Sequence, residues 1–287
     1  MILVTGATGR VGYRVMEALA DADADATAMV RVAARGADLP GAGKYIVATF
    51  DQPPAPEVLR LFDRIFLLSP AIEEQAELEI VFIDALVAAG HQPHVVKVAA
   101  DGFAEPDCDV RFMRSHRQIA THLDATGLPA TYLAPTMYME NLLGAAESLR
   151  REGTIYAPAG QGRVGFVAAG DVAKVAARVL TGSADQDRTY LLSGPEALGY
   201  RDVAERISVV FAREVDYTDL PEDRAREQML ASGPTPWQVE GMLEWFDWIG
   251  AGAADSVTTD VREATGKDAR PIEDWLDESR SAFLSPL

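Results

Sequence analysis

Short apolar segments alternate with longer amphipathic segments over the first two thirds of the chain. Continuous apolar runs are typical of buried parallel strands, and apolar positions three and four residues apart are typical of helices. The expected strands lie at residues 2–4, 26–31, 44–50, 64–68, 93–100, 130–134 and 189–193. The helices between the first six strands include segments at 11–20, 57–62, 75–89 and 110–125. This alternation predicts an α/β fold with a doubly wound parallel sheet of about seven strands and right-handed crossovers.

The regularity weakens after the sixth expected strand. From Gly194 onward the sequence has helical segments and aromatic residues but no further strand–helix alternation. We therefore expect a nucleotide-binding domain over residues 1–150, completed by about 166–193. Residues 151–165 and 194–287 are expected to form a smaller, mainly helical cap that binds the substrate.

The first strand runs directly into three glycines spaced three apart, Gly6, Gly9 and Gly12. In a Rossmann-type strand–turn–helix unit, such glycines allow a tight turn, the approach of backbone N–H groups to a pyrophosphate, and close packing of helix on strand. The start of the helix then complements the negative charge of the phosphates. One helical face of the following segment is apolar, as that unit requires: Val11, Val15, Met16, Leu19 and Ala20. The pattern predicts a dinucleotide-binding turn, with an ordinary glycine-rich turn of another α/β domain as the alternative.

Arginines occupy the positions that distinguish the two nicotinamide dinucleotides. Proteins that use the non-phosphorylated dinucleotide usually place an acidic residue at the end of the second strand, to bind the ribose 2′-hydroxyl. Here that residue is Arg31, with Arg35 four residues later and Arg10 in the glycine turn. Planar guanidinium groups suit a 2′-phosphate, so we expect NADP(H) as the cofactor. The alternative is that these are surface arginines without a ligand.

Three further residues are candidate cofactor contacts. Asp51 follows the third expected strand and could accept a hydrogen bond from the adenine amino group, although a loop cap is the alternative. Leu68 and Ser69 lie at the carboxyl end of the fourth strand, the edge at which doubly wound sheets bind ligands.

Charge and cysteine content exclude several classes of protein. The 26 Lys and Arg residues against 44 Asp and Glu give a formal net charge of −18, which repels nucleic acid and anionic membranes. The apolar runs are too short to span a bilayer. We also expect no signal peptide, since the first residues do not show a charged segment followed by an apolar segment and a cleavage site. Cys108 is the single cysteine and the four histidines are scattered, so we expect neither a disulfide framework nor a metal site. These observations predict a cytoplasmic protein with a small-molecule ligand, and they leave a homodimer open.

The order of the motifs resembles the atypical short-chain dehydrogenase/reductases, specifically the NmrA-like branch with its NAD(P)H:quinone reductases and redox-sensing regulators. The matching segments are residues 4–12, 30–31, 95–98, 135–141, 171–173 and 192–195. The resemblance implies that the backbone from Thr8 to Val11 holds the pyrophosphate and that Arg31 holds the 2′-phosphate. It also implies that Pro135 and Tyr138 lie beside the nicotinamide.

The usual catalytic residues of short-chain reductases are missing. The expected serine at the end of the fifth strand falls on Ala99 or Ala100, and the following helix has neither the tyrosine nor the lysine of Tyr-x-x-x-Lys. Lys97 lies inside the strand and is no simple substitute. The protein must therefore act without a tyrosine acid.

Two functions agree with this absence. In the first, the protein is a ketoreductase that resembles those of aromatic polyketide (antibiotic) pathways, or a quinone reductase, and its substrate is an aromatic ketone or quinone. The proton then comes from the substrate, from water or from His116, whose ordinary pKa of about 6.5 suits proton transfer near neutrality. The expected substrate-binding residues are Ala100, Asp101, His116, Met137, Tyr138, Phe166 and Trp245. In the second, the protein binds the dinucleotide as a non-catalytic redox sensor. The alternative for His116, a lone histidine on a helix with arginines on either side, is a surface or capping residue. The alternative for Asp101 is a residue that forms a turn.

Overall fold

A parallel sheet of seven strands forms the centre of the molecule. The computed structural model describes residues 1–41 and 43–284, and the strand order is β3-β2-β1-β4-β5-β6-β9, with every neighbouring pair parallel. The strands are β1 (Ile2–Val4), β2 (Ala26–Val30), β3 (Tyr45–Val47), β4 (Arg64–Leu67), β5 (His94–Val98), β6 (Ala130–Pro135) and β9 (Thr189–Leu192). The order reverses beside β1, where a doubly wound sheet opens a crevice at its carboxyl edge. The predicted fold is confirmed.

The third strand is shorter than the sequence predicts. It ends at Val47 rather than Phe50, and both Tyr45 and Val47 are exposed. As an edge strand it pairs with β2 alone, so nothing on its other side extends the ladder. Asp51 consequently lies in a loop, four residues beyond the strand end.

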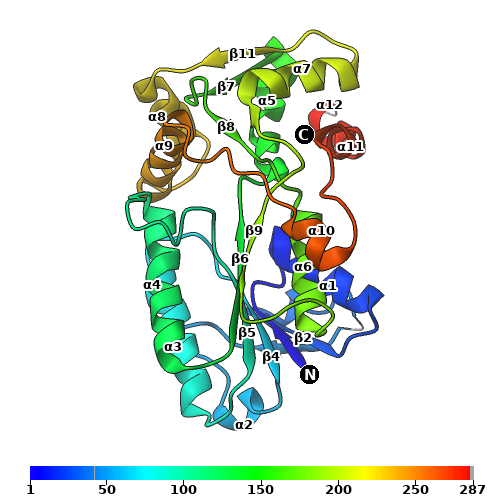
Figure 1. Cartoon of the computed structure of the whole chain (residues 1–287), viewed down its shortest axis with the longest axis vertical. Helices are drawn as coiled ribbons and strands as arrows, with labels where there is room; N and C mark the ends of the chain where they lie inside the picture. The colour runs from blue at the N-terminus through cyan, green and yellow to red at the C-terminus, as the bar shows by residue number, and fades with distance from the viewer. Residues whose placement is uncertain (42, 285–287) are drawn as a thin grey trace.

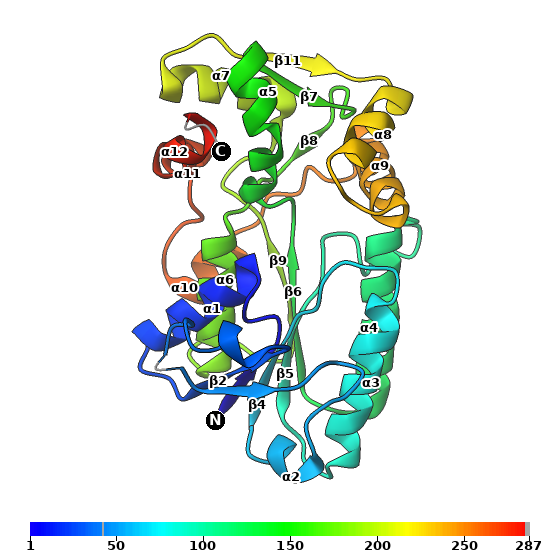
Figure 2. The ribbon, with the colours of Figure 1, turned by 180° about the vertical axis from the view of Figure 1, so that it is seen from behind.

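Helices cover both faces of the sheet (Figures 1 and 2). One face carries α1 (Arg10–Asp21) and α6 (Ala169–Leu180), which pack together, and the other carries α3 (Gln75–Ala88) and α4 (Arg111–Thr126). The short helices α2 (Pro56–Leu59) and η1 (Ala33–Arg35) lie in the connections. The central strands β1, β4, β5 and β6 are buried between these layers, which explains their continuous apolar sequence.

A cap stands above the carboxyl edge of the sheet (Figure 1). Its helices are η2 (Met139–Ala145), α5 (Ala146–Glu152), α7 (Tyr200–Phe211), α8 (Glu222–Ala231), α9 (Pro236–Gly250), α11 (Ile272–Glu278) and α12 (Arg280–Leu284). It also contains two small sheets: β7 (Thr154–Ala157) with β11 (Asp216–Asp219), parallel, and β8 (Arg163–Val164) with β10 (Leu198–Gly199), antiparallel. The cap has its own apolar core.

One helix of the C-terminal segment lies outside the cap. α10 (Asp260–Thr265) packs against α6 and β9, and Val261 and Ala264 belong to the apolar core of the sheet domain. The chain therefore crosses from the cap to the sheet and back after α9. The proposed division into two domains remains a prediction. Within the described part of the chain, no helix has the length and apolar character needed to cross a membrane.

Candidate active site

The glycine turn is so compact that two of its positions exclude any side chain. Gly6 has φ +61°, and a Cβ there would lie 2.6 Å from the carbonyl oxygen of Leu68. A Cβ on Gly12 would lie 2.1 Å from the carbonyl oxygen of Gly6, well inside contact distance. Thr5 connects the turn to β4, because its Oγ1 accepts a hydrogen bond from the N–H of Leu68 at 2.8 Å. The turn thus holds the start of α1 against the crevice beside β1.

The N-terminus of α1 is suited to an anion. Its N-cap is Gly9, so no side chain caps the first turn, and that turn contains no acidic residue. The N–H of Gly9 donates to the carbonyl oxygen of Gly6 at 2.9 Å, whereas the N–H groups of the first helical turn and the positive end of the helix dipole face outward. The residues at this turn, including Thr8, Gly9 and Arg10, are exposed. This arrangement fits the pyrophosphate of a dinucleotide.

Arg10, Arg31 and Arg35 are free to bind a ligand. All three are exposed, and no described residue forms an ion pair or a side-chain hydrogen bond with them. Arg31 directly follows β2, and Arg35 ends η1. Burial and the charge of Glu140 raise the pKa of Tyr138, while the charge of Arg10 acts in the opposite direction, so Arg10 and Tyr138 lie within electrostatic range of each other.

The other predicted cofactor residues differ in exposure and in whether their polar groups already have hydrogen-bond partners. Leu68 is half-buried, and its backbone lies against Gly6. The hydroxyl of Ser69 points into the core and donates to Glu79 Oε1 at 2.6 Å, so it is already engaged. Asp51 is exposed in its loop. Pro135 is buried at the end of β6, which carries the chain towards the cap.

Tyr138 and its neighbours join the sheet to the cap. Tyr138 forms an isolated parallel bridge with Val167 and is half-buried. Met137 and Phe166 are buried in the cap core, where Tyr200 contacts both: its hydroxyl lies 3.2 Å from Met137 Sδ, and its ring packs edge-on against Phe166. Met137 and Phe166, which we expected to contact the substrate, are therefore covered by the cap core, and Tyr138 is the most exposed of the three.

The loop after β5 meets cap helix α9. Ala100 and Asp101 are half-buried, and burial raises the pKa of Asp101 to about 6. Ala100 and the half-buried Trp245 share an apolar cluster with Met113. A carboxyl group with a raised pKa beside an apolar surface is typical of a functional site. The structure thus brings Ala100, Asp101 and Trp245, three of the predicted substrate residues, to the carboxyl end of the sheet.

His116 is buried, contrary to its more common role as a surface or capping residue. It lies on the inner face of α4, and its Nδ1 is 3.3 Å from Nζ of Lys97, which is fully buried in β5. Burial and the charge of Lys97 lower the pKa of His116 well below its ordinary value. The side chain is therefore neutral near pH 7 and is a poor source of an acidic proton. The sequence pattern gave no sign of this neighbour, because the two residues come from different elements.

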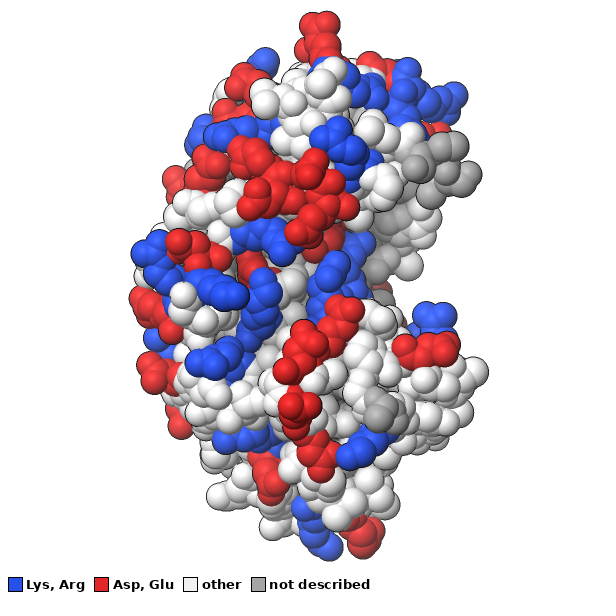
Figure 3. Space-filling model, turned by 90° about the vertical axis from the view of Figure 1, so that its right-hand side faces the viewer, with Lys and Arg blue, Asp and Glu red and all other residues white. Residues whose placement is uncertain are grey.

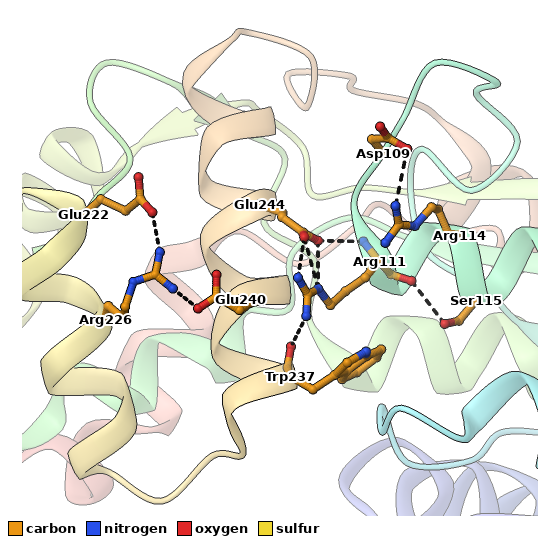
Figure 4. A network of polar contacts seen from close by, with 9 residues as sticks. All are labelled: Asp109, Arg111, Arg114, Ser115, Glu222, Arg226, Trp237, Glu240 and Glu244. Carbon is orange, nitrogen blue, oxygen red and sulfur yellow. Dashed lines mark hydrogen bonds and ion pairs between the residues drawn. The ribbon is translucent and has the colours of Figure 1, made fainter.

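An ion pair fastens the cap to the sheet domain at this end (Figure 4). Arg111, the first residue of α4, donates from Nη2 to Glu244 Oε1 of α9 at 2.6 Å, and its backbone N–H donates to the second oxygen at 2.8 Å. Its Nη1 also donates to the carbonyl oxygen of Trp237. Next to it, Phe112 packs edge-on against the Trp237 ring. This contact, which sequence reasoning missed, fixes α9 and therefore Trp245.

On the face shown in Figure 3, basic and acidic side chains are interleaved, and the outline of the molecule is notched between its upper and lower parts. Among the described residues, no group of three or more His, Cys, Asp or Glu side chains is placed to hold a metal ion.

The fold and the glycine turn together define a Rossmann-type dinucleotide-binding protein. The NmrA-like family matches residues 1–276, and the chain belongs to that family. It is 35% identical to the (4-alkanoyl-5-oxo-2,5-dihydrofuran-3-yl)methyl phosphate reductase of Streptomyces griseus, over 99% of both chains. It is 30% identical to the NAD(P)H azoreductase of Xenophilus azovorans, again over 99% of both chains.

Solved structures share the fold. The NADPH-dependent quinone oxidoreductase of Escherichia coli, in complex with NADPH, superimposes with a TM-score of 0.86 at 21% identity, over 97% of this chain and 99% of that one. The triphenylmethane reductase of Citrobacter, in complex with NADP(H), has a TM-score of 0.82 at 22% identity, over 96% and 99%. With the relatives above, these likenesses confirm the expected class, an NADP(H)-dependent oxidoreductase of the NmrA-like type.

Proposed function

We propose that this protein is an NADPH-dependent reductase that transfers hydride to the carbonyl carbon of an aromatic ketone or quinone. The observation that carries the proposal is the carboxyl end of β1, where an uncapped helix N-terminus follows the glycine turn and where Arg10, Arg31 and Arg35 have no ion-pair or side-chain hydrogen-bond partner among the described residues. The apolar cluster that includes Ala100 and Trp245 follows the end of β5. When bound, the coenzyme supplies the hydride from C4 of its nicotinamide. Aromatic polyketide ketones belong to the substrate class proposed here.

The chain's own residues have separate tasks in this reaction. The backbone from Thr8 to Val11 holds the pyrophosphate, and Arg31 and Arg35 bind the 2′-phosphate. Tyr138 packs beside the nicotinamide. The apolar wall that includes Trp245 excludes water from the reacting carbonyl and orients a flat ring against it.

The names of the relatives support a reductase without fixing its substrate. One relative is named for the reduction of a phosphorylated furanone and another for azo reduction, and the structural neighbours are named for quinones and triphenylmethane dyes. We propose conjugated, mostly aromatic acceptors for this chain, because the wall beside Ala100 is apolar and half-exposed.

The test is NADPH consumption, followed by absorbance, with 2-methyl-1,4-naphthoquinone, an ortho-hydroxy aryl ketone and a saturated aliphatic ketone as acceptors. We expect consumption with the first two and little with the third. NADPH binding without consumption of any acceptor would contradict the proposal and indicate a redox sensor instead.

The source of the proton can be tested with the same assay. A phenolic hydroxyl beside the carbonyl can neutralise the developing alkoxide, so no protein acid is then required. We expect removal of that hydroxyl to lower kcat much more than it raises KM. Equal rates for the two ketones would reject substrate-assisted protonation.

A further inference from the structure

Four polar side chains form a chain in the core between the sheet and helices α3 and α4. They are Ser69 after β4, Glu79 in α3, Lys97 in β5 and His116 in α4, and they are 6%, 0%, 0% and 8% exposed. Ser69 Oγ donates to Glu79 Oε1 at 2.6 Å, Glu79 Oε2 lies 3.1 Å from Lys97 Nζ, and Nζ lies 3.3 Å from His116 Nδ1. In the described part of the chain, no other ion pair has both side chains fully buried. Burying such a pair is costly, so its presence next to a candidate site points to a task other than stability.

The chemistry of the lysine decides which nitrogen of His116 carries the proton. An ammonium group has three protons to donate and no lone pair to accept with. Three acceptors surround Nζ: Glu79 Oε2, the carbonyl oxygen of Val98 and His116 Nδ1. Nδ1 must therefore offer its lone pair to Lys97. A neutral imidazole that accepts at Nδ1 holds its proton on Nε2.

The surroundings of His116 keep the ring neutral. Lys97 faces it from β5, and Glu79 of α3 lies behind Lys97; the charge of the ammonium group opposes a second positive charge on the ring. Burial and this charge both lower the pKa of His116. Burial also lowers the pKa of Lys97, and the charge of Glu79 opposes that shift without cancelling it. The Glu79 carboxylate at 3.1 Å is the contact that favours a charged lysine beside a neutral histidine.

His116 lies close to the proposed substrate wall. On α4 it is one helical turn beyond Met113, which shares an apolar cluster with Ala100 and Trp245. Its partner Lys97 lies in β5, one residue before the strand ends at Val98, and the loop that carries Ala100 and Asp101 follows directly. Nε2 has no hydrogen-bond partner among the described residues. A donor without a described partner therefore lies about one helical turn from the apolar cluster that includes Ala100 and Trp245.

We propose that His116 donates a hydrogen bond from Nε2–H to the substrate's carbonyl oxygen, and that Lys97, Glu79 and Ser69 are positioning residues that fix this tautomer. The proposal rests on the reductase function proposed above. As hydride adds to the carbonyl carbon, the π-electron pair moves to the oxygen, and a neutral donor stabilises the growing charge without giving up its proton. For a ketone, the proton that completes the alcohol then comes from water or from a hydroxyl of the substrate. For a quinone, the same addition and protonation give a hydroxy-dienone, which becomes the hydroquinone when the reduced carbon loses its proton to water and the second carbonyl oxygen gains one. His116 is thus a hydrogen-bond donor and not the acid that its ordinary pKa suggested.

The tautomer can be measured without any turnover. We would label the histidine side chains of the whole protein with ¹⁵N and assign the His116 signals by their absence in H116Q. We expect the neutral Nε2–H form of His116 throughout a titration from about pH 5.5 to 8, a range around the ordinary histidine pKa. In K97M/E79Q, which removes the ion pair without leaving a buried carboxylate alone, we expect a mixture of tautomers; K97R should retain the wild-type pattern.

Wild-type protein alone can overturn the proposal. An Nδ1–H tautomer, or a charged His116 ring at pH 6 and above, would show that Lys97 does not direct the proton, even if every Lys97 variant failed to fold.

Kinetics test the donor itself, with 2-methyl-1,4-naphthoquinone as the acceptor. The amide N–H of Gln at position 116 can replace the Nε2–H donor, whereas Leu cannot. We expect H116L to lose about 100-fold in kcat with an unchanged Kd for NADPH, and H116Q to stay within roughly tenfold of wild type. Equal kcat for H116L and wild type would overturn the donor role. Failure of the reductase proposal has a different signature, since wild-type protein would then consume no NADPH whatever the tautomer of His116.

Discussion

Replacement of Arg31 and Arg35 by alanine tests how the protein distinguishes NADPH from NADH. Both guanidinium groups are exposed and have no ion-pair or side-chain hydrogen-bond partner among the described residues, so their removal breaks no internal contact. We expect the free energy of unfolding to change by less than about 0.5 kcal/mol. The whole effect should therefore appear in coenzyme binding.

The size of the effect follows from the exposure of the two side chains. A hydrogen bond to a charged group contributes about 1.5–3 kcal/mol, and screening at an exposed site favours the lower end of that range. At about 1.4 kcal/mol for each tenfold change, R31A and R35A should each weaken NADPH binding roughly tenfold, and the double variant roughly 100-fold. NADH lacks the 2′-phosphate, so its Kd should change little.

The assay is a fluorescence titration of each variant with NADPH and with NADH at low and high salt. The difference between wild type and the double variant should shrink at high salt, because screening weakens exposed charge pairs. Arg201 provides a matched control, since it is an exposed arginine on cap helix α7 that also lacks a described partner. An equal loss of affinity for both coenzymes, or no loss for either, would refute the assignment of the 2′-phosphate site.

Three further predictions follow from the same geometry. G12A should reduce both Tm and NADPH affinity, because the new Cβ would lie 2.1 Å from the carbonyl oxygen of Gly6; normal binding by a folded G12A protein would contradict the proposed turn. R111M should lower the free energy of unfolding by about 1–3 kcal/mol and raise substrate KM, since it leaves Glu244 half-buried without its partner. Burial alone would raise the pKa of Glu244, but its hydrogen bonds and ion pair with Arg111 outweigh burial and lower it. The stabilisation from this pair is therefore present above the unfolded pKa and is lost as pH falls through the folded pKa. Urea titrations at several pH values measure this, and a pH-independent difference in stability between R111M and wild type would count against it. Burial raises the pKa of Asp101 to about 6, so ionisation of this carboxyl group opposes folding as pH rises from about 4 to 6. D101N should therefore be more stable than wild type at pH 7 and equally stable below pH 4. A stability difference of the opposite sign would show that burial does not disfavour the ionised carboxylate.

The sequence by itself determined the fold and the cofactor. Continuous apolar runs separated by helical periodicity permit few arrangements other than a parallel sheet with helices on both faces. Gly6 and Gly12 lie in one local turn whose function depends on residues adjacent in the chain, so a dozen residues were sufficient to identify it. The position of Arg31 directly after β2 could be predicted in the same way, and its contact with the 2′-phosphate stays a prediction.

Only the tertiary structure decided what surrounds the substrate end of the site. His116 and Lys97 are separated by 18 residues and lie in a helix and a strand, and no periodicity in the sequence indicates that their nitrogens meet. Arg111 and Glu244 are 133 positions apart, and their pairing depends on how the cap settles on α4. Local patterns specify backbone conformation, whereas the protonation and orientation of a side chain depend on neighbours that packing brings from distant segments. For this reason the fold and the NADP(H) cofactor could be predicted from the sequence, while the state of the buried histidine could not.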